Sequence, residues 1–226
     1  MILCEGVGFA YPDGTQALDE VDLSIESGER VAIIGRNGSG KTTLARLWNG
    51  LLRPTTGRVL IDGHPTEGRR VPELARMVGL TFQDPTRQLF LRTCRAEVAF
   101  GARNASLRGR RVDAAVDVAL DAVGLADQAS TAPYDLGPSR RRLLAIGSVI
   151  AMQTPVVVLD EPTIGLDSAQ VPAVATLVER LAAEGRTVVT ISHDARFVER
   201  YFQRAIRLDA GRVVADGTPA EVLGPG

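Results

Sequence analysis

The sequence is poor in lysine, cysteine, histidine and aromatic residues. Of the 26 basic residues among 226, only Lys41 is a lysine, and all the others are arginines. Two cysteines can form at most one pair, which excludes a disulfide framework and favours free thiols in a cytosolic protein. Two histidines are too few for a histidine-rich metal cluster. These shortages exclude disulfide-stapled and histidine-rich metal-binding classes.

Long apolar runs and an excess of charge are absent too. No apolar run approaches the roughly 18 residues of a membrane span, and the first residues do not read as a signal peptide. The formal net charge is −1, which gives no long-range field for nucleic acid or an anionic membrane. Arginines gather at residues 108–111 and 140–142, where a solvated helix face or turn is the simplest interpretation. The length suits one large α/β domain, with or without an inserted subdomain.

The single lysine lies in the segment Gly35-Arg36-Asn37-Gly38-Ser39-Gly40-Lys41-Thr42-Thr43. This segment fits G-x-x-x-x-G-K-[ST], the phosphate-binding loop of nucleotide-binding proteins. Glycines let backbone N–H groups close around phosphate oxygens, and a lysine ammonium is compact enough to lie between the β- and γ-phosphates. Thr42 would offer its hydroxyl to Mg²⁺. Residues 30–34 before the loop read as a buried strand and residues 43–49 after it as a helix, so we predict nucleotide binding.

The fold class follows from short apolar stretches at residues 78–82, 156–159 and 187–191. They are rich in β-branched residues and bounded by polar ones, which is typical of buried parallel strands. Apolar residues recur every three or four positions between 171 and 181, and Gly185 should end this helix. Such alternation of strands and helices predicts a parallel sheet with both faces covered.

The two remaining parts of the chain show other patterns. Residues 2–31 and 57–62 alternate like strands, with turns at Asp13-Gly14 and Asp62-Gly63, and predict a small antiparallel sheet. Between Phe82 and Gln153 the strand pattern disappears, and apolar stripes at 112–123 and 143–152 predict helices. There is no internal repeat. We therefore expect one α/β domain over residues 1–226, with a helical insertion at residues 84–153.

A second chemical motif follows the strand at 156–159, which ends in Asp160 and Glu161. Ligands of open α/β sheets bind at the carboxyl ends of the strands. Asp160 can hold Mg²⁺, and Glu161 can polarise an attacking water as a general base. The alternative is a strand that happens to end in an acidic turn. The phosphate loop in the same chain favours the catalytic interpretation.

With both motifs present, the sequence resembles the nucleotide-binding subunits of ABC transporters over essentially its whole length. Residues 161–167 (EPTIGLD) resemble the family's segment that joins the second nucleotide motif to the D-loop, which implies that Asp167 lies at a subunit interface. The segment Ile191-Ser192-His193-Asp194 resembles the switch-histidine motif, which implies that His193 contacts the γ-phosphate and orders the catalytic carboxylate. Tyr11 matches the aromatic residue that stacks on adenine, although it could also be an ordinary edge-strand tyrosine.

The segment Thr81-Phe82-Gln83-Asp84-Pro85 resembles the family's Q-loop. The resemblance implies that Gln83 contacts the metal and the attacking water and reports to a membrane partner. It also implies ATP as substrate, with Mg²⁺ held by Thr42, Gln83 and Asp160. The continuation to Phe90 resembles Q-N/D-P-x-x-Q-L-F, and residues 96–101 also resemble the same subgroup, the energy-coupling-factor (ECF) ATPases. These ATPases drive uptake of vitamins and of cobalt or nickel ions.

One family motif is altered. The family carries LSGGQ, whose donors bind the γ-phosphate held by the opposite subunit, whereas this chain has Leu136-Gly137-Pro138-Ser139-Arg140. Gly137 has no hydroxyl, and Pro138 has no backbone N–H. Pro138 also suits the first turn of a helix, and Ser139 could partly replace the missing hydroxyl. We interpret the segment as a degenerate signature and predict a heterodimer with one competent ATP site.

The expected protein is an ATPase subunit at the cytoplasmic face of the cell membrane. Its partners would be a second ABC ATPase and integral membrane transport and substrate-binding subunits, with no nucleic acid. One alternative is an ABC protein of translation or DNA repair, which usually has tandem ATPase units or a long coiled coil. Another is a regulatory subunit that binds ATP and hydrolyses little. The transported substrate, and whether the chain is part of a longer ATPase, stay open.

Overall fold

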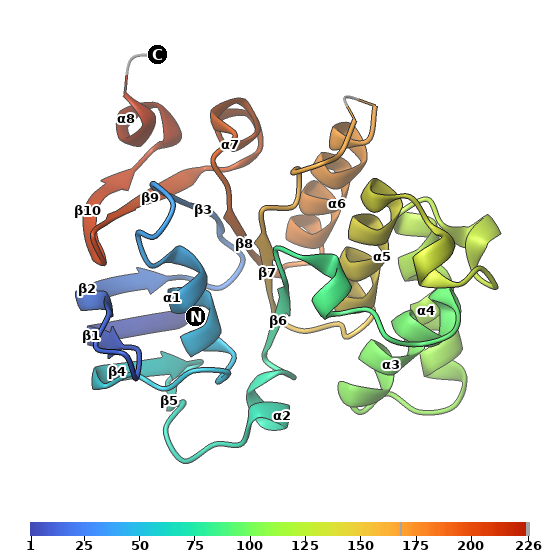
Figure 1. The fold of residues 1–226 in the computed structure, drawn as a ribbon, viewed down its shortest axis with the longest axis horizontal. Coiled ribbons are helices and arrows are strands. Elements are labelled where there is room, and N and C mark those ends of the chain that lie inside the picture. The colour runs from blue at the N-terminus through green and yellow to red at the C-terminus, as the bar shows by residue number, and fades with distance from the viewer. Residues whose placement is uncertain (168, 225–226) are drawn as a thin grey trace.

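The computed structural model describes residues 1–167 and 169–224 and contains two sheets. The smaller sheet is antiparallel, with strand order β2-β1-β4-β5. Its strands are β1 (Ile2–Ala10), β2 (Gln16–Ile25), β4 (Thr56–Ile61) and β5 (His64–Pro65). It lies on the side of the molecule that carries the N-terminus (Figure 1). The predicted antiparallel sheet is therefore present, although residues 30–31 belong to the other sheet.

The larger sheet has the strand order β10-β9-β3-β8-β7-β6. All neighbours are parallel except β10, which runs antiparallel to β9. The strands are β3 (Arg30–Ile34), β6 (Val78–Thr81), β7 (Val156–Asp160), β8 (Thr187–Ile191), β9 (Arg204–Asp209) and β10 (Arg212–Gly217). The carboxyl ends of the parallel strands therefore meet at one edge, where ligands of such sheets bind.

Both faces of the larger sheet are buried, which explains its continuous apolar strands. On β7, Val156 and Val158 pack into a core with α1 (Lys41–Trp48) and the smaller sheet. The alternate residues Val157 and Leu159 pack into a second core with α5 (Pro138–Ile150) and α6 (Val171–Ala183). Because successive side chains of a strand point to opposite faces, every residue of β7 is buried.

The middle of the chain is helical, and its helices α3, α4 and α5 lie on the side away from the smaller sheet (Figure 1). They comprise α3 (Cys94–Asn104), α4 (Arg110–Ala122) and α5, and residues 84–153 contain no strand. The shorter helices are α2 (Val71–Leu74), α7 (Ala195–Tyr201) and α8 (Pro219–Leu223). Within the residues described, no helix is both long enough and apolar enough to cross a membrane.

The structure differs from the sequence-based expectation at helix starts and in the last strands. The helix after the glycine-rich loop starts at Lys41 rather than at residue 43. Helix α5 starts at Pro138, the proline that suited a first turn, and therefore before the apolar stripe that begins at residue 143. Strand β9 was not expected because Arg204 and Arg207 interrupt its apolar pattern. The Arg204 guanidinium is satisfied by Asp216 at 2.7 Å and by Glu29 at 3.1 Å, so the strand can carry it.

Candidate functional site

The glycine-rich loop leaves the carboxyl end of β3 and leads into α1. Gly40 immediately before the helix has φ 101°, and a Cβ there would lie 2.5 Å from the main-chain oxygen of Ala17. Only glycine fits both constraints. The Lys41 ammonium folds back onto the loop and donates to the main-chain oxygens of Gly35 and Arg36, each at 2.8 Å. Burial lowers the pKa of Lys41, while the carboxylates of Glu161 and Asp160 favour its charged form.

A cavity of about 460 Å³ opens beside this loop. Its size lies within the range of small-molecule sites. Most of the residues predicted to bind nucleotide or to act in catalysis line it. They are Tyr11, Asn37, Gly38, Ser39, Gly40, Lys41, Thr42, Thr43, Gln83, Asp160 and Glu161, together with Thr15, Gln16, Ala17 and Ile191.

Asp160 is a buried residue that lines this cavity. Its Oδ2 accepts from the Thr42 hydroxyl at 3.0 Å, and its backbone N–H donates to the Thr81 hydroxyl at the same distance. The other oxygen, Oδ1, is buried and has no hydrogen-bond partner among residues 1–167 and 169–224. Burial raises the pKa of Asp160, which the Thr42 hydrogen bond opposes. A carboxylate that contacts the Thr42 hydroxyl and keeps one unpartnered oxygen, in a cavity that Gln83 also lines, fits Mg²⁺, which prefers oxygen ligands.

Glu161 and His193 form the second part of the site. The Glu161 backbone has φ 50°, unusual for a residue with a side chain, and its N–H donates to the Ile191 carbonyl at 2.8 Å. His193 Nδ1 lies 3.0 Å from each oxygen of the buried Glu161 carboxylate. The imidazole remains largely exposed. This arrangement orients the carboxylate and leaves the rest of the ring free for another group.

Tyr11 also lines the cavity, with its hydroxyl 2.9 Å from the Thr43 hydroxyl. Its ring packs edge-on against Phe9, with the ring centroids 4.9 Å apart. These contacts hold the phenol ring on the cavity wall without covering it completely. The ring can therefore support a planar group bound beside the glycine-rich loop.

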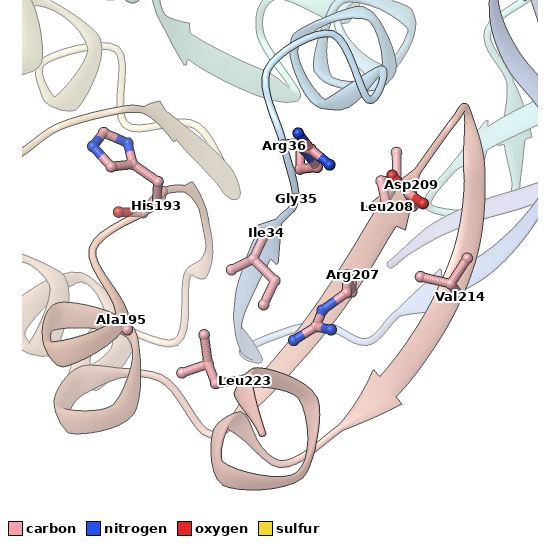
Figure 2. Close-up of a pocket in the computed structure, with 11 residues that line it drawn as sticks. Ile34, Gly35, Arg36, His193, Ala195, Arg207, Leu208, Asp209, Val214 and Leu223 are labelled. Atoms are coloured by element: carbon pink, nitrogen blue, oxygen red, sulfur yellow. The ribbon is translucent and has the colours of Figure 1, made fainter. Parts of the chain in front are cut away.

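Arg36 does not line this cavity, although the motif includes it. Its side chain lies with His193, Arg207 and Asp209 around a separate cavity of about 500 Å³, which Ile34 and Gly35 at the junction of β3 and the loop also line (Figure 2). Arg36 contributes its main-chain oxygen to Lys41. Gly35 also lines the second cavity, so these two residues support the loop through their backbone.

The comparison with known proteins agrees with this geometry. Residues 18–164 match the family described as ABC transporter. The chain belongs to the ABC transporter family. The energy-coupling factor transporter ATP-binding protein EcfA of Methanothermobacter thermautotrophicus is 38% identical over 225 residues, covering 99% of this chain and 72% of EcfA. EcfA of Methanocaldococcus jannaschii is 38% identical over 217 residues, covering 95% of this chain and 78% of that EcfA.

The fold of this ABC ATPase is also that of a solved relative. The structure of CbiO1 from Clostridium perfringens, part of the ABC transporter complex CbiONQ, has a TM-score of 0.87 and 35% identity. The match covers 98% of this chain and 90% of CbiO1. These similarities confirm the predicted fold class and the resemblance to ECF-type ATPases. The protein is an ATPase of the transporter type.

The predicted signature residues of this ABC ATPase lie outside the nucleotide cavity. Leu136 is buried, Gly137 precedes α5, and Pro138 is the first residue of that helix. The following residues are Ser139, which is half-buried, and Arg140, which is exposed. Asp167 is exposed as well, and its carboxylate accepts from the N–H groups of Ala169 and Gln170 at 3.0 and 2.9 Å. The structure therefore shows a local turn role for Asp167.

Two functional contacts were not anticipated from the sequence. Gln88, within the ECF-like pattern, accepts from the Phe82 N–H and donates to the Ala145 carbonyl at 2.9 Å, which ties the Q-loop to α5. Arg142 donates to the main-chain oxygen of Glu161 at 3.1 Å. The arginine run at 140–142 was the only sequence signal for Arg142, and a solvated helix face explained it equally well.

Proposed function

We propose that this ABC ATPase energises an ECF-type membrane importer for a vitamin or a transition-metal ion. The observation that carries the proposal is the shared cavity of the glycine-rich loop, Gln83, Asp160 and Glu161, in a chain similar to EcfA and CbiO1. ATP would lie with its phosphates on residues 37–43 and its adenine on Tyr11. The Q-N/D-P-x-x-Q-L-F pattern supports the ECF assignment within the family.

Each residue of the cavity has a role in this proposal. Lys41 would exchange its loop carbonyls for the β- and γ-phosphates of ATP, which carry more charge. Mg²⁺, held by Thr42, Gln83 and Asp160, supplies charge neutralisation for the phosphates when bound. Glu161 would accept the proton of the attacking water, and His193 would hold that carboxylate in place while facing the γ-phosphate.

A groove next to the nucleotide cavity suits a membrane partner. It has a volume of about 480 Å³ and shares Gln83 with the nucleotide cavity. Its other lining residues are Arg46, Leu51, Leu52, Phe82, Asp84 and Arg87. Leu51 is exposed, so an apolar partner surface could cover it. Because Gln83 faces both cavities, a transport subunit in this groove would sense the γ-phosphate through one side chain.

The altered signature supports an asymmetric pair. In the head-to-tail dimer that the family resemblance implies, the signature of one subunit completes the ATP site of the other. Here Pro138 offers no N–H and Gly137 offers no hydroxyl to a partner's phosphate. We propose that a second ABC ATPase supplies intact signature donors to Lys41 and Glu161 of this chain. The complex would sit at the cytoplasmic face of the membrane through its transport and substrate-binding subunits.

Purification from the native cell tests this proposal. The tagged chain should isolate with a second ABC ATPase that carries LSGGQ and with integral membrane proteins. ATP hydrolysis by this complex should exceed that of the isolated chain by at least about tenfold. Lys41→Ala in the tagged chain should abolish its ATP binding and serves as the control. Isolation with ribosomes or DNA-repair proteins instead would contradict the transport function.

A further inference from the structure

Arg142 joins the helix that begins at the signature to the segment that carries the catalytic carboxylate. It lies on α5 (Pro138–Ile150), and its Nη1 donates to the main-chain oxygen of Glu161 at 3.1 Å. The only other donor to this oxygen, among the residues described, is the N–H of Ile164 at 3.3 Å. Arg142 is thus the only side chain there that holds the Glu161 peptide.

The Glu161 backbone needs such support. A φ of 50° places it in the left-handed region, which costs on the order of 1–3 kcal/mol for a residue with a side chain. The N–H of Glu161 is anchored to the Ile191 carbonyl on β8. The carbonyl oxygen of Glu161 is held by the weak turn hydrogen bond from the Ile164 N–H and by the hydrogen bond from Arg142. This backbone conformation places the Glu161 side chain on the wall of the nucleotide cavity.

The surroundings of Arg142 keep its guanidinium charged and directed at this carbonyl. The side chain is half-buried, and burial lowers its pKa, whereas the carboxylates of Glu161, Asp84 and Asp160 favour the charged form. No carboxylate among the residues described lies within 4.0 Å of it, so its hydrogen bond to a neutral carbonyl is not replaced by an ion pair. A hydrogen bond from a charged donor is about twice as strong as one between neutral groups.

Arg142 also stands where three segments of the ATPase meet. A small cavity of about 170 Å³ beside it is lined by Asp84 of the Q-loop, Pro138 at the start of α5, and Gly165 of the segment after Glu161. A shift of α5 against the larger sheet would therefore move the guanidinium relative to the Glu161 carbonyl.

We propose that Arg142 is a positioning residue for ATP hydrolysis, which holds the left-handed backbone of Glu161 and so keeps its carboxylate at the attacking water. Arg142 thereby transmits the position of the signature helix to the general base. The proposal rests on the assignment of Glu161 as that base.

Steady-state kinetics of the transport complex, isolated through a tag on this chain, test the proposal. Arg142→Gln should lower kcat by about ten- to hundredfold, the factor expected for loss of one hydrogen bond from a charged donor. The KM for ATP should stay within about twofold, because Arg142 does not line the nucleotide cavity. Arg142→Lys should recover part of kcat. The matched control is Arg111→Gln, an exposed arginine at the start of α4, which should behave as wild type.

A double-mutant cycle distinguishes failure of this proposal from failure of its premise. In a Glu161→Gln background, the Arg142→Gln substitution should have little further effect, because both act through the same carboxylate. An inactive Glu161→Gln with a wild-type kcat in Arg142→Gln would overturn only the role of Arg142. Wild-type turnover in Glu161→Gln would overturn the general-base assignment and the proposal with it.

Hydrogen exchange of the isolated chain provides a second test, for which no partner is needed. Arg142→Gln should speed exchange of the backbone amides of Glu161 and of residues 163–166 by at least about tenfold, for the same lost hydrogen bond. Amides of β3 and β8 should exchange as in wild type, which shows that the fold is intact. Unchanged exchange at Glu161 and residues 163–166 would overturn the proposal.

Discussion

At the scale of single residues, the site uses side chains whose burial is unfavourable without a ligand. Lys41 folds back onto main-chain oxygens, and Asp160 keeps a buried oxygen without a hydrogen-bond partner in the part of the chain that the structure describes. Burial disfavours the charged form of both groups. Bound phosphates would offset the cost of burying the Lys41 ammonium, and a bound divalent cation would offset the cost of burying the Asp160 carboxylate. In each case the ligand supplies a charge opposite to that of the side chain.

Asp160 therefore allows a prediction about stability. Asp160→Asn should raise the free energy of unfolding of the ligand-free protein by about 1 kcal/mol, which corresponds to roughly 2–4 °C in Tm. Addition of Mg²⁺ and ATP should raise the Tm of the wild type. The same addition should raise the Tm of Asp160→Asn much less. Differential scanning calorimetry measures both changes. A lower ligand-free Tm in Asp160→Asn would show that the carboxylate stabilises the fold.

Tyr11 allows a second prediction at this scale. Tyr11→Ala should weaken ATP binding by about 1–3 kcal/mol, the range for one base stacked on one aromatic ring. Tyr11→Trp should be tolerated, because it retains a ring. Tyr11→Phe loses only the hydroxyl contact with Thr43 and serves as the matched control. Equilibrium binding of a fluorescent ATP analogue measures each affinity. Equal affinity of the wild type and the three variants would contradict adenine stacking and would mean that Tyr11 is only a strand residue.

At the scale of elements, the helical insertion depends on one close approach. A Cβ on Gly101 of α3 would lie 2.2 Å from the main-chain oxygen of Ser148 on α5. Glycine thus lets α3 pack directly on the helix that begins at the signature. Gln88 adds a second link to α5 through the Ala145 carbonyl and the Ser148 hydroxyl. The ECF-like pattern around Gln88 therefore has a structural role, which is to join the Q-loop to α5.

Gly101→Ala should accordingly destabilise the protein by about 1–3 kcal/mol, the usual cost of overpacking a tight contact. Gly147→Ala on α5 is the matched control, because its Cβ would meet the Val123 side chain at 3.2 Å, which can shift. The gain in helix propensity should roughly offset that contact. Chemical denaturation compares the two variants. A Gly101→Ala protein as stable as wild type would show that α3 and α5 can move apart.

At the scale of the whole molecule, the predicted signature is separate from the nucleotide cavity, because none of residues 136–140 lines it. In the proposed head-to-tail dimer, the signature donors for the ATP on Lys41 would come from the partner subunit. The backbone before α5 is already set for a helix start, with Gly137 extended and Pro138 in the first turn. The altered residues thus fit the fold of this chain, and in the proposed dimer their effect would fall on the phosphates bound by the partner subunit.

Restoring the signature tests this asymmetry. Replacing residues 137–140 by Ser-Gly-Gly-Gln should raise the ATPase rate of the isolated chain by about 10²-fold or more, since each missing donor to a developing charge has an effect of that order. The unmodified chain should hydrolyse ATP weakly alone. Robust hydrolysis by the unmodified homodimer, with no gain on restoration, would contradict the heterodimer.

The sequence by itself determined the local parts of this protein. The glycine-rich loop, the buried strands β6, β7 and β8 and the helix α6 depend on backbone preference and apolar periodicity, which act over a few neighbouring residues. Strand β9 was missed because Arg204 interrupts its apolar pattern, and the acidic residues that pair with this arginine, Asp216 and Glu29, lie outside the strand. The apolar stripe of α5 indicated only the part from residue 143, because its first turn carries proline and arginines, and Pro138 was the one signal for the true start.

Only the tertiary structure decided how the chemical groups meet. Thr42 and Asp160 are 118 positions apart in sequence, and their side chains lie 3.0 Å apart because β3 and β7 end at the same edge of a parallel sheet. The contact of Arg142 with the Glu161 carbonyl depends on the packing of α5 against that sheet. No local pattern encodes such contacts, because they depend on which faces of distant elements exclude water together.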